Sequence, residues 1–301
     1  MSKVRRILVA VDQFPQSKAA LARALEFARA HDARLTIVHI VDERDAQSAQ
    51  ELGATEKRRI ERQALSFARK RVEDAIRAHD PGRIELDLRV EAGSPSARVV
   101  EIAHDLGVDL VVLRAHQRRS IREQVLGSTA DRIIRATSSS VLVVKRPVER
   151  AYRNVVVAVE FSDVSQTTAI LSAGMCPGVR LHLVHVTHVS LQFEQAMLRA
   201  GTSQAKMLAF RRTLATQARD RLRRLAARFT GCEHPPRTRV MEGDPARSLV
   251  RLTSSAGVDL IALGPYEHGV IRLALLGSVT QHLLREAGCD VLISRPHPAT
   301  T

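Results

Sequence analysis

The chain has 301 residues with 45% apolar and 3% aromatic side chains, which suits about two globular domains whose cores are built from Val, Leu, Ile and Ala. The scarcity of aromatic rings argues against a stacking platform for single-stranded nucleic acid. The formal net charge of +14 permits attraction to nucleic acid, anionic lipid or acidic proteins, but it selects none of them.

Apolar runs and helical patterns alternate along the first half of the chain. The alternation predicts strands over 6–12, 34–41, 84–90, 110–113 and 141–145, and helices over 16–31, 54–79, 95–106 and 128–137. Such an order implies an α/β fold with a mostly parallel sheet and helices on both faces. In such a sheet, ligands bind beyond the carboxyl ends of the strands, where the strand order reverses.

The second half repeats this plan. Residues 259–278 align with residues 109–128 without a gap, at an offset of 150 residues. A period this long indicates a duplicated domain rather than a solenoid. We therefore expect two similar domains, at 1–147 and 154–296, joined by a short linker at 148–153. The second crossover is longer in the second domain and should be broken near 201–203.

The N-terminal sequence and the cysteines indicate in which cellular compartment we expect the protein. The first six residues lead straight into an apolar run and lack the apolar stretch of a signal peptide. No segment approaches 18 apolar residues, so we expect no membrane span and a cytoplasmic protein. Cys176, Cys232 and Cys289 form no close pair, and we expect them to be inert packing residues.

The loop after the fourth strand of the second half carries a pattern that suits phosphate. Gly264 would allow the backbone to approach a ligand closely, and Gly277 and Ser278 precede a predicted helix, whose first N–H groups attract anions. Taken alone, Gly-Ser before a helix is equally typical of ordinary helix capping.

The sequence of this loop and of the segments around it resembles that of the universal stress protein family. ATP-binding members of that family carry Gly, two residues, Gly, nine residues, Gly and then Ser or Thr after the fourth strand. The resemblance covers both halves and includes the Val-Ala-Val-Asp ending at Asp12, the turn at Gly93 and the Val-Leu-Val-Val ending at Val144. Residues 115–117 also look like the first repeat of two-domain proteins related to universal stress protein E.

This resemblance implies two tandem adenine-nucleotide-alpha-hydrolase-like (Rossmann-like) domains, each a five-stranded parallel sheet flanked by helices. It also implies that the two domains pair about a pseudo-twofold axis through their last strands, at 141–145 and 291–294. Pairing of this kind would hide two edge strands. A further homodimer is left open.

The resemblance also implies which positions would contact a nucleotide. In the second domain, which we favour, they are Ala158, Glu160, Val186, Gly264, Glu267, Gly277, Ser278 and Val279. In the first domain they are Ala10, Asp12, Ile40, Arg114, Gln117, Gly127, Ser128 and Thr129.

Both sites depart from the glycine pattern. In the first domain Arg114 and Gln117 stand at the first two glycine positions, and the bulk of Arg114 opposes close backbone approach, although its charge could meet phosphate. In the second domain the second glycine is Glu267, whose carboxylate would repel a polyphosphate. The sites are therefore degenerate, and ATP is a candidate ligand rather than an assigned cofactor. The second domain keeps more of the pattern.

Several other residues have competing interpretations. We expect His39 and His185 to be satisfied core histidines, and Asp109 and Asp259 to cap or hydrogen-bond locally. His116 and Tyr266 suit loop packing or ligand contact, and the cluster of Arg118, Arg119 and Arg122 suits a solvated surface or an anion contact. In the predicted helical segment 220–228, we expect Leu222 and Leu225 to be buried and the arginines to face solvent. Asp220 and Arg224 are spaced to form an i,i+4 ion pair.

No catalytic constellation is visible. The chain has neither a Walker motif nor a Gly-x-Ser-x-Gly elbow, and the turns after the first strands lack the signatures of related pyrophosphatases and nucleotidyl transferases. We expect a non-catalytic stress-response protein that binds a small molecule or a protein partner, and no metal. The alternatives are a slow ATPase, or a protein that binds an anionic partner, of which nucleic acid is the less favoured.

Overall fold

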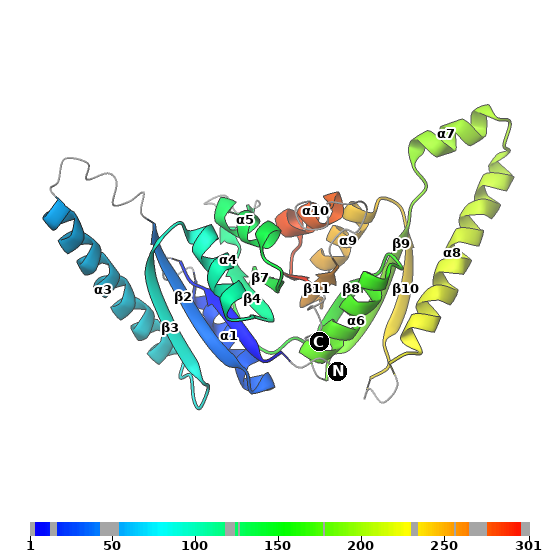
Figure 1. Ribbon diagram of the computed structural model, residues 1–301. Coiled ribbons are helices and arrows are strands. Elements are labelled where there is room, and N and C mark those ends of the chain that lie inside the picture. The colour runs from blue at the N-terminus through cyan, green and yellow to red at the C-terminus, as the bar shows by residue number, and fades with distance from the viewer. Residues whose placement is uncertain are drawn as a thin grey trace. The chain divides into compact units, whose positions relative to one another are not determined.

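The computed structural model describes residues 4–12, 17–42, 54–117, 124–125, 127–176, 178–229, 234–255, 257–264 and 276–295. The chain divides into two compact units, one formed mainly by 2–151 and the other by 152–267 with 276–294. We call them the N-terminal and the C-terminal unit and describe each by itself (Figure 1).

The N-terminal unit is built on five parallel strands. They are β1 (Arg6–Ala10), β2 (Arg34–Asp42), β3 (Leu86–Gly93), β4 (Leu110–Arg114) and β7 (Ser140–Val144), in the order β3-β2-β1-β4-β7. The helices are α1 (Lys18–His31), α3 (Ala54–Ala78), α4 (Pro95–Asp105) and α5 (Ser128–Ala136). The predicted elements are confirmed to within about two residues at most ends. A two-residue antiparallel pair, β5 (His116–Gln117) with β6 (Gln124–Val125), was not expected.

The C-terminal unit repeats the same sheet. Its strands are β8 (Asn154–Ala158), β9 (Arg180–Thr187), β10 (Arg237–Glu242), β11 (Leu260–Leu263) and β12 (Asp290–Ile293), all parallel in the order β10-β9-β8-β11-β12. Its helices are α6 (Asp163–Met175), α7 (Leu191–Arg199), α8 (Gln204–Ala226), α9 (Pro245–Ser254) and α10 (Ser278–Glu286). The expected break in the long crossover falls between α7 and α8.

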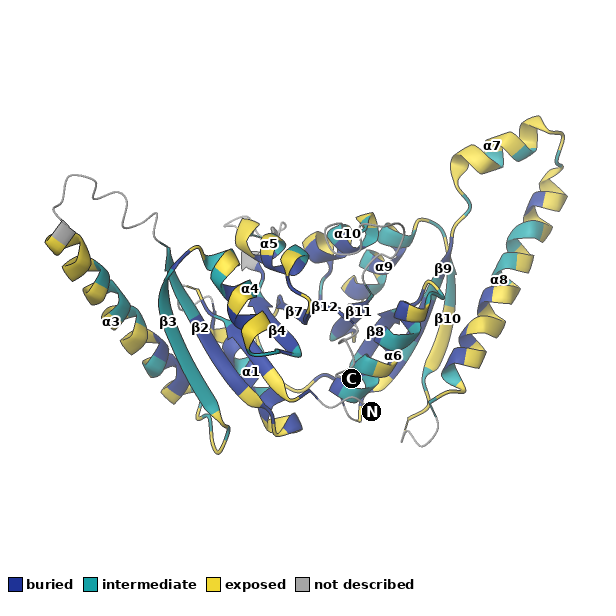
Figure 2. Cartoon of the chain, in the orientation of Figure 1, coloured by how far each residue is buried: buried dark blue, intermediate teal, exposed yellow. Residues whose placement is uncertain are grey.

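The core of each unit lies along its central strands. Ile7, Leu8 and Val9 of β1 are almost completely buried, as are the three valines 155–157 of β8, because helices cover both sides of a parallel sheet. Figure 2 shows this buried interior, with exposed residues along the outer faces of α3 and α8. Helix α7 buries none of its residues, and Phe193 is half exposed.

Two aspartates join the first strand of each unit to the fourth. Asp109 Oδ2 accepts hydrogen bonds from the backbone N–H groups of Arg5 (2.7 Å) and Arg6 (2.9 Å). Asp259 Oδ2 accepts from Arg153 and Asn154, both at 2.9 Å. The expectation of local bonding was wrong, because these partners lie more than a hundred residues away in the chain. Each carboxylate satisfies N–H groups at the entrance to the first strand.

Among the described residues, no helix has both the length and the apolar character needed to cross a bilayer. Cys176 and Cys289 are buried free thiols, as expected of packing residues, and Cys232 lies outside the described residues.

Candidate functional site

The candidate site of the C-terminal unit lies at the carboxyl ends of β8 and β11. These two strands are neighbours in the sheet, and β8 is the point where strand order reverses. Ala158 ends β8 and is half-buried, Val186 on β9 is buried, and Glu160 just beyond β8 is exposed. The Ser162 hydroxyl donates to Glu160 Oε1 at 3.1 Å. The strand ends therefore offer a small apolar surface with one carboxylate.

The start of α10 has a glycine at its N-cap. Gly277 is in extended conformation there, and no side chain of the described residues caps the helix. The other four helices described in this unit are capped by the side chains of Ser162, Ser190, Ser203 and Asp244. Because α10 leads into the parallel strand β12, its N-terminus lies on the side of the strand carboxyl ends. Its first backbone N–H groups and the exposed Ser278 can bind an anion there.

Gly264 has a packing role that the sequence did not reveal. A Cβ atom at this position would lie 2.7 Å from Val164 Cγ1 and 3.1 Å from Thr168 Oγ1, both on α6. A contact under 3.0 Å forces neighbouring atoms to move. The glycine is therefore needed where α6 packs on the end of β11, whether or not a ligand approaches.

A histidine supports the strand ends in each unit. His39 Nδ1 donates to the carbonyl oxygen of Val11 (2.9 Å), and His185 Nδ1 donates to that of Val159 (2.7 Å). Both side chains are half-buried, so the expectation of satisfied histidines is confirmed. Burial lowers the pKa of His185, and the positive charge of Arg221 lowers it further, against the opposing effects of the Val159 carbonyl and Glu160.

The N-terminal unit uses the corresponding positions differently. Arg114 Nη1 donates to the carbonyl oxygen of Val144 at 3.0 Å, so its guanidinium fastens the end of β7 to β4. The N–H of Asp12 donates to Ser17 Oγ at 2.8 Å, while the Asp12 side chain is exposed. Ala10 and Ile40 are half-buried, and Ser128 and Thr129 are exposed at the start of α5. Gly127 is the N-cap of α5, which also has no side-chain cap from the residues that the structure describes.

Some predicted residues lie outside the described part of the chain. They are Glu267, Tyr266, Arg118, Arg119 and Arg122. Gln117 lies in β5, where its partner is Gln124. Within the described residues, no cluster of His, Cys, Asp and Glu side chains is placed to hold a metal ion.

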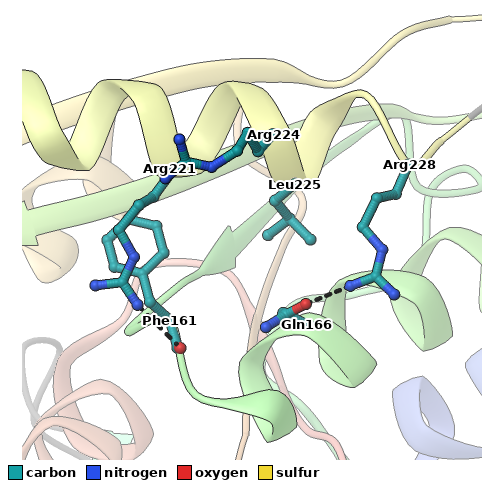
Figure 3. A pocket seen from close by; sticks show the side chains of 6 residues that line it. All are labelled: Phe161, Gln166, Arg221, Arg224, Leu225 and Arg228. Carbon is teal, nitrogen blue, oxygen red and sulfur yellow. Dashed lines mark hydrogen bonds between the residues drawn. The ribbon is translucent and has the colours of Figure 1, made fainter.

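The sequence did not reveal a cavity of about 220 Å³ between α6 and α8. Its lining residues are Phe161, Gln166, Arg221, Arg224, Leu225 and Arg228 (Figure 3). The burial of Leu222 and Leu225 and the exposure of the arginines are confirmed, and three of these arginines also line the hollow. The expected pair of Asp220 with Arg224 was wrong, because Asp220 pairs with Arg223 at 3.4 Å. The i, i+3, i+7 spacing of these three arginines was the available signal.

Comparison with known proteins gives two matches to the model of the universal stress protein family, at residues 3–145 and 151–295. A protein of Staphylococcus haemolyticus that carries the universal stress protein name is 34% identical over 148 residues, which are 48% of this chain and 87% of the relative. A similarly named protein of Staphylococcus epidermidis is 32% identical over 148 residues, which are 48% of this chain and 86% of the relative.

Two solved structures share the fold over almost the whole chain. A protein of Pseudomonas aeruginosa described as functionally unknown has a TM-score of 0.65 at 16% identity, covering 98% of this chain and 93% of its own. A universal stress protein of Archaeoglobus fulgidus has a TM-score of 0.65 at 14% identity, covering 96% and 97%. At these identities the likeness concerns the fold alone.

Proposed function

The chain belongs to the universal stress protein family, and from that premise we propose that it is a non-catalytic stress-response protein whose C-terminal domain binds an adenine nucleotide. The observation that carries this proposal is the start of α10, the one helix described in its unit without a side-chain cap. A helix start left open at the carboxyl ends of a parallel sheet suits a phosphate group.

Each residue of the favoured site has a proposed role. Gly277, Ser278 and Val279 offer backbone N–H groups and a hydroxyl to the phosphates, where the helix dipole favours negative charge. In this proposal Ala158 and Val186 contact the base, and the exposed Glu160 accepts a hydrogen bond from a ribose hydroxyl. Gly264 keeps the neighbouring backbone free of side-chain bulk. Glu267 opposes binding through its charge.

The N-terminal domain is the weaker candidate. Gly127 leaves α5 open in the same way, but Arg114 holds the carbonyl of Val144 and fills the place of a glycine. Its guanidinium is thereby engaged in holding β4 to β7. We propose that this domain has a structural role, or one toward a protein partner, and binds nucleotide less tightly than the C-terminal domain.

The experiment is calorimetric titration of ATP into the full chain and into Ser278→Ala, with Ser128→Ala as the matched control at the start of α5. We expect Ser278→Ala to weaken binding about tenfold, because a hydrogen bond to a charged group is worth about 1.5–3 kcal/mol. Ser128→Ala should have little effect. Glu267→Gly should strengthen binding by about 1–3 kcal/mol if the carboxylate is partly desolvated.

The result would contradict the proposal if ATP bound equally well to wild type and Ser278→Ala, or if only Ser128→Ala weakened it. Turnover of ATP with magnesium tests the non-catalytic part of the proposal. A rate in wild type clearly above that of Ser278→Ala would favour the slow ATPase instead. Mass spectrometry of small molecules that purify with the native protein would identify a different ligand.

A further inference from the structure

The cavity between α6 and α8 has a consistent chemistry. Of its six lining residues, three carry a positive charge and none carries a negative charge. Figure 3 shows Arg221 extending from α8 and Arg228 from the turn that follows α8, both toward α6 and on either side of Leu225. The cavity therefore concentrates guanidinium groups over a small apolar patch at the start of α6.

Contacts inside the cavity orient two of these guanidinium groups. Arg228 Nη1 donates to Gln166 Oε1, while Gln166 Nε2 faces Asp163 Oδ1 at 3.5 Å. Arg221 stacks over the ring of Phe161, with its Cζ 4.1 Å from the ring centroid, and Nη2 donates to the Phe161 carbonyl at 3.4 Å. A guanidinium has five N–H donors, so both groups retain donors for a ligand.

The backbone at Phe161 has a conformation that bulky residues rarely adopt. Its φ of 68° is left-handed, which costs free energy for a side chain of this size. The ring lies against His185, with centroids 4.4 Å apart. Burial and Arg221 lower the pKa of that histidine, so it adds no second cation beneath the ring near neutral pH. Phe161 thus provides an apolar support for Arg221.

The duplication gives an internal comparison for the arginines. At the offset of 150 residues between the starts of α3 and α8, the buried Leu222 and Leu225 correspond to the buried Val72 and Ala75. The positions of Arg221, Arg224 and Arg228 then correspond to Arg71, Asp74 and Ala78. The same fold is made in the N-terminal unit without three cations on this face, so packing alone does not require them.

Placement near a helix end explains part of the arrangement but not all of it. Cations are stabilised near a helix C-terminus, and α8 ends at Ala226. Arg223 lies in the last turn with Arg224 and benefits in the same way, yet it does not line the cavity, and Arg221 lies before that turn. Three mutually repelling guanidinium groups around one hollow are stabilised best by a small anion with several acceptor oxygens.

We propose that this cavity binds a small phosphate-bearing anion, held between Arg221 and Arg228 with Arg224 at its rim. Tetrahedral phosphate accepts paired hydrogen bonds from guanidinium forks, and its charge offsets that of the arginines. The cavity adjoins the site proposed for the nucleotide, because Phe161 follows Glu160 directly in the chain, but the two sites share no residue. Inorganic phosphate and a phosphate monoester are the two sources of this chemistry.

The test is calorimetric titration of inorganic phosphate and of glycerol 3-phosphate into the full chain at about 0.15 M ionic strength, where exposed charges are screened over about 8 Å. The pocket variant is Arg224→Gln/Arg228→Gln. The matched control is Arg219→Gln/Arg223→Gln, which also removes two positive charges, from positions on α8 that do not line the cavity. All four arginines are exposed, so both variants should fold. We expect the pocket variant to bind about tenfold or more weakly, and the control to change affinity by no more than about twofold.

Tighter binding of glycerol 3-phosphate than of phosphate would support a site for monoesters, and the reverse would support a site for the free anion. No binding of either to wild type would overturn the proposal. Equal losses of affinity in the pocket variant and the control would overturn it too, because the general positive charge of this surface would then account for the binding. Binding that survives in the pocket variant but is lost in Ser278→Ala would assign the anion to α10 and overturn it as well.

Discussion

Gly264 lies so close to Val164 that a Cβ atom on the glycine would come within 2.7 Å of Val164 Cγ1. Helix α6 therefore packs directly on the backbone at the end of β11. The same glycine belongs to the pattern that suggests a phosphate loop. Its presence alone is thus no measure of nucleotide binding, because packing of the C-terminal unit already requires it.

Gly264→Ala should destabilise the C-terminal unit by about 1–3 kcal/mol, the usual cost of forcing one extra carbon into a packed site. The measurement is urea denaturation combined with hydrogen exchange of the amides of β11. In the double variant Gly264→Ala/Val164→Ala, the clash is removed, and the combined loss should be smaller than the sum of the single losses. Strictly additive losses would show that the contact with Val164 is not responsible.

The architecture was predictable because it depends on local patterns that occur twice. The apolar run at β1 and its copy at β8 predicted buried parallel strands, and the break at 201–203 separated α7 from α8 as expected. Burial by both helical layers requires such runs whatever the ligand.

The chemistry of the site was harder to predict because it depends on contacts distant in sequence. The sequence placed Gly264 in a phosphate loop, but its packing reason needs the position of Val164 on another element. Likewise, Phe161 and Arg221 are 60 residues apart, and only folding brings the guanidinium over the ring. A helical pattern shows that Arg221, Arg224 and Arg228 share a face, but not that α6 leaves a hollow opposite it.

His185 should make the stability of the C-terminal unit depend on pH. Burial, aided by Arg221, lowers its pKa below the usual value of about 6.5. As pH falls below about 6.5, the unfolded chain binds a proton at this residue that the folded chain resists, so the free energy of unfolding decreases. The loss ends once the pH is below the folded-state pKa. His182 should act in the same direction, because burial, with Arg237 and Arg180, lowers its pKa too.

The measurement is the urea midpoint of wild type and His185→Gln at a series of pH values from neutral to mildly acidic. The difference in urea midpoint between wild type and variant should become smaller as the pH falls. Wild type loses stability through protonation of His185, whereas the variant has no imidazole at this position. Adding His182→Gln should flatten the curve further. A constant difference across the range would show that His185 does not contribute to the pH dependence.

Tyr152 should stabilise the start of β12 through its hydroxyl. The Tyr152 hydroxyl donates to Asp290 Oδ2 at 2.5 Å, and both residues are buried. Tyr152→Phe keeps the ring but removes this bond to a charged group, so the free energy of unfolding should fall by about 1.5–3 kcal/mol. Chemical denaturation measures the change. Tyr152→Phe should cost much less in an Asp290→Asn background, and an undiminished cost there would contradict the pairing.

Asp259 and Asp109 make the same pair of bonds in the two units, so they should have matched effects. Asp259→Ala removes the acceptor for the N–H groups of Arg153 and Asn154, and we expect a loss of about 2 kcal/mol, moderated by partial solvent exposure. Asp259→Asn keeps one acceptor oxygen without the charge and should lose roughly half as much. Asp109→Ala should cause a comparable loss in the N-terminal unit, where the acceptor for Arg5 and Arg6 is removed.

Hydrogen exchange separates these effects from a general loss of stability. In Asp259→Ala, the amides of Arg153 and Asn154 should exchange faster than those at the middle of β8, because their acceptor is gone while the neighbouring ladder to β9 and β11 remains. The amides of β1 should be unaffected, and Asp109→Ala should give the reverse pattern. If either variant accelerated exchange equally in β1 and β8, this prediction would be wrong. Each aspartate would then not act only on the first strand of its own unit.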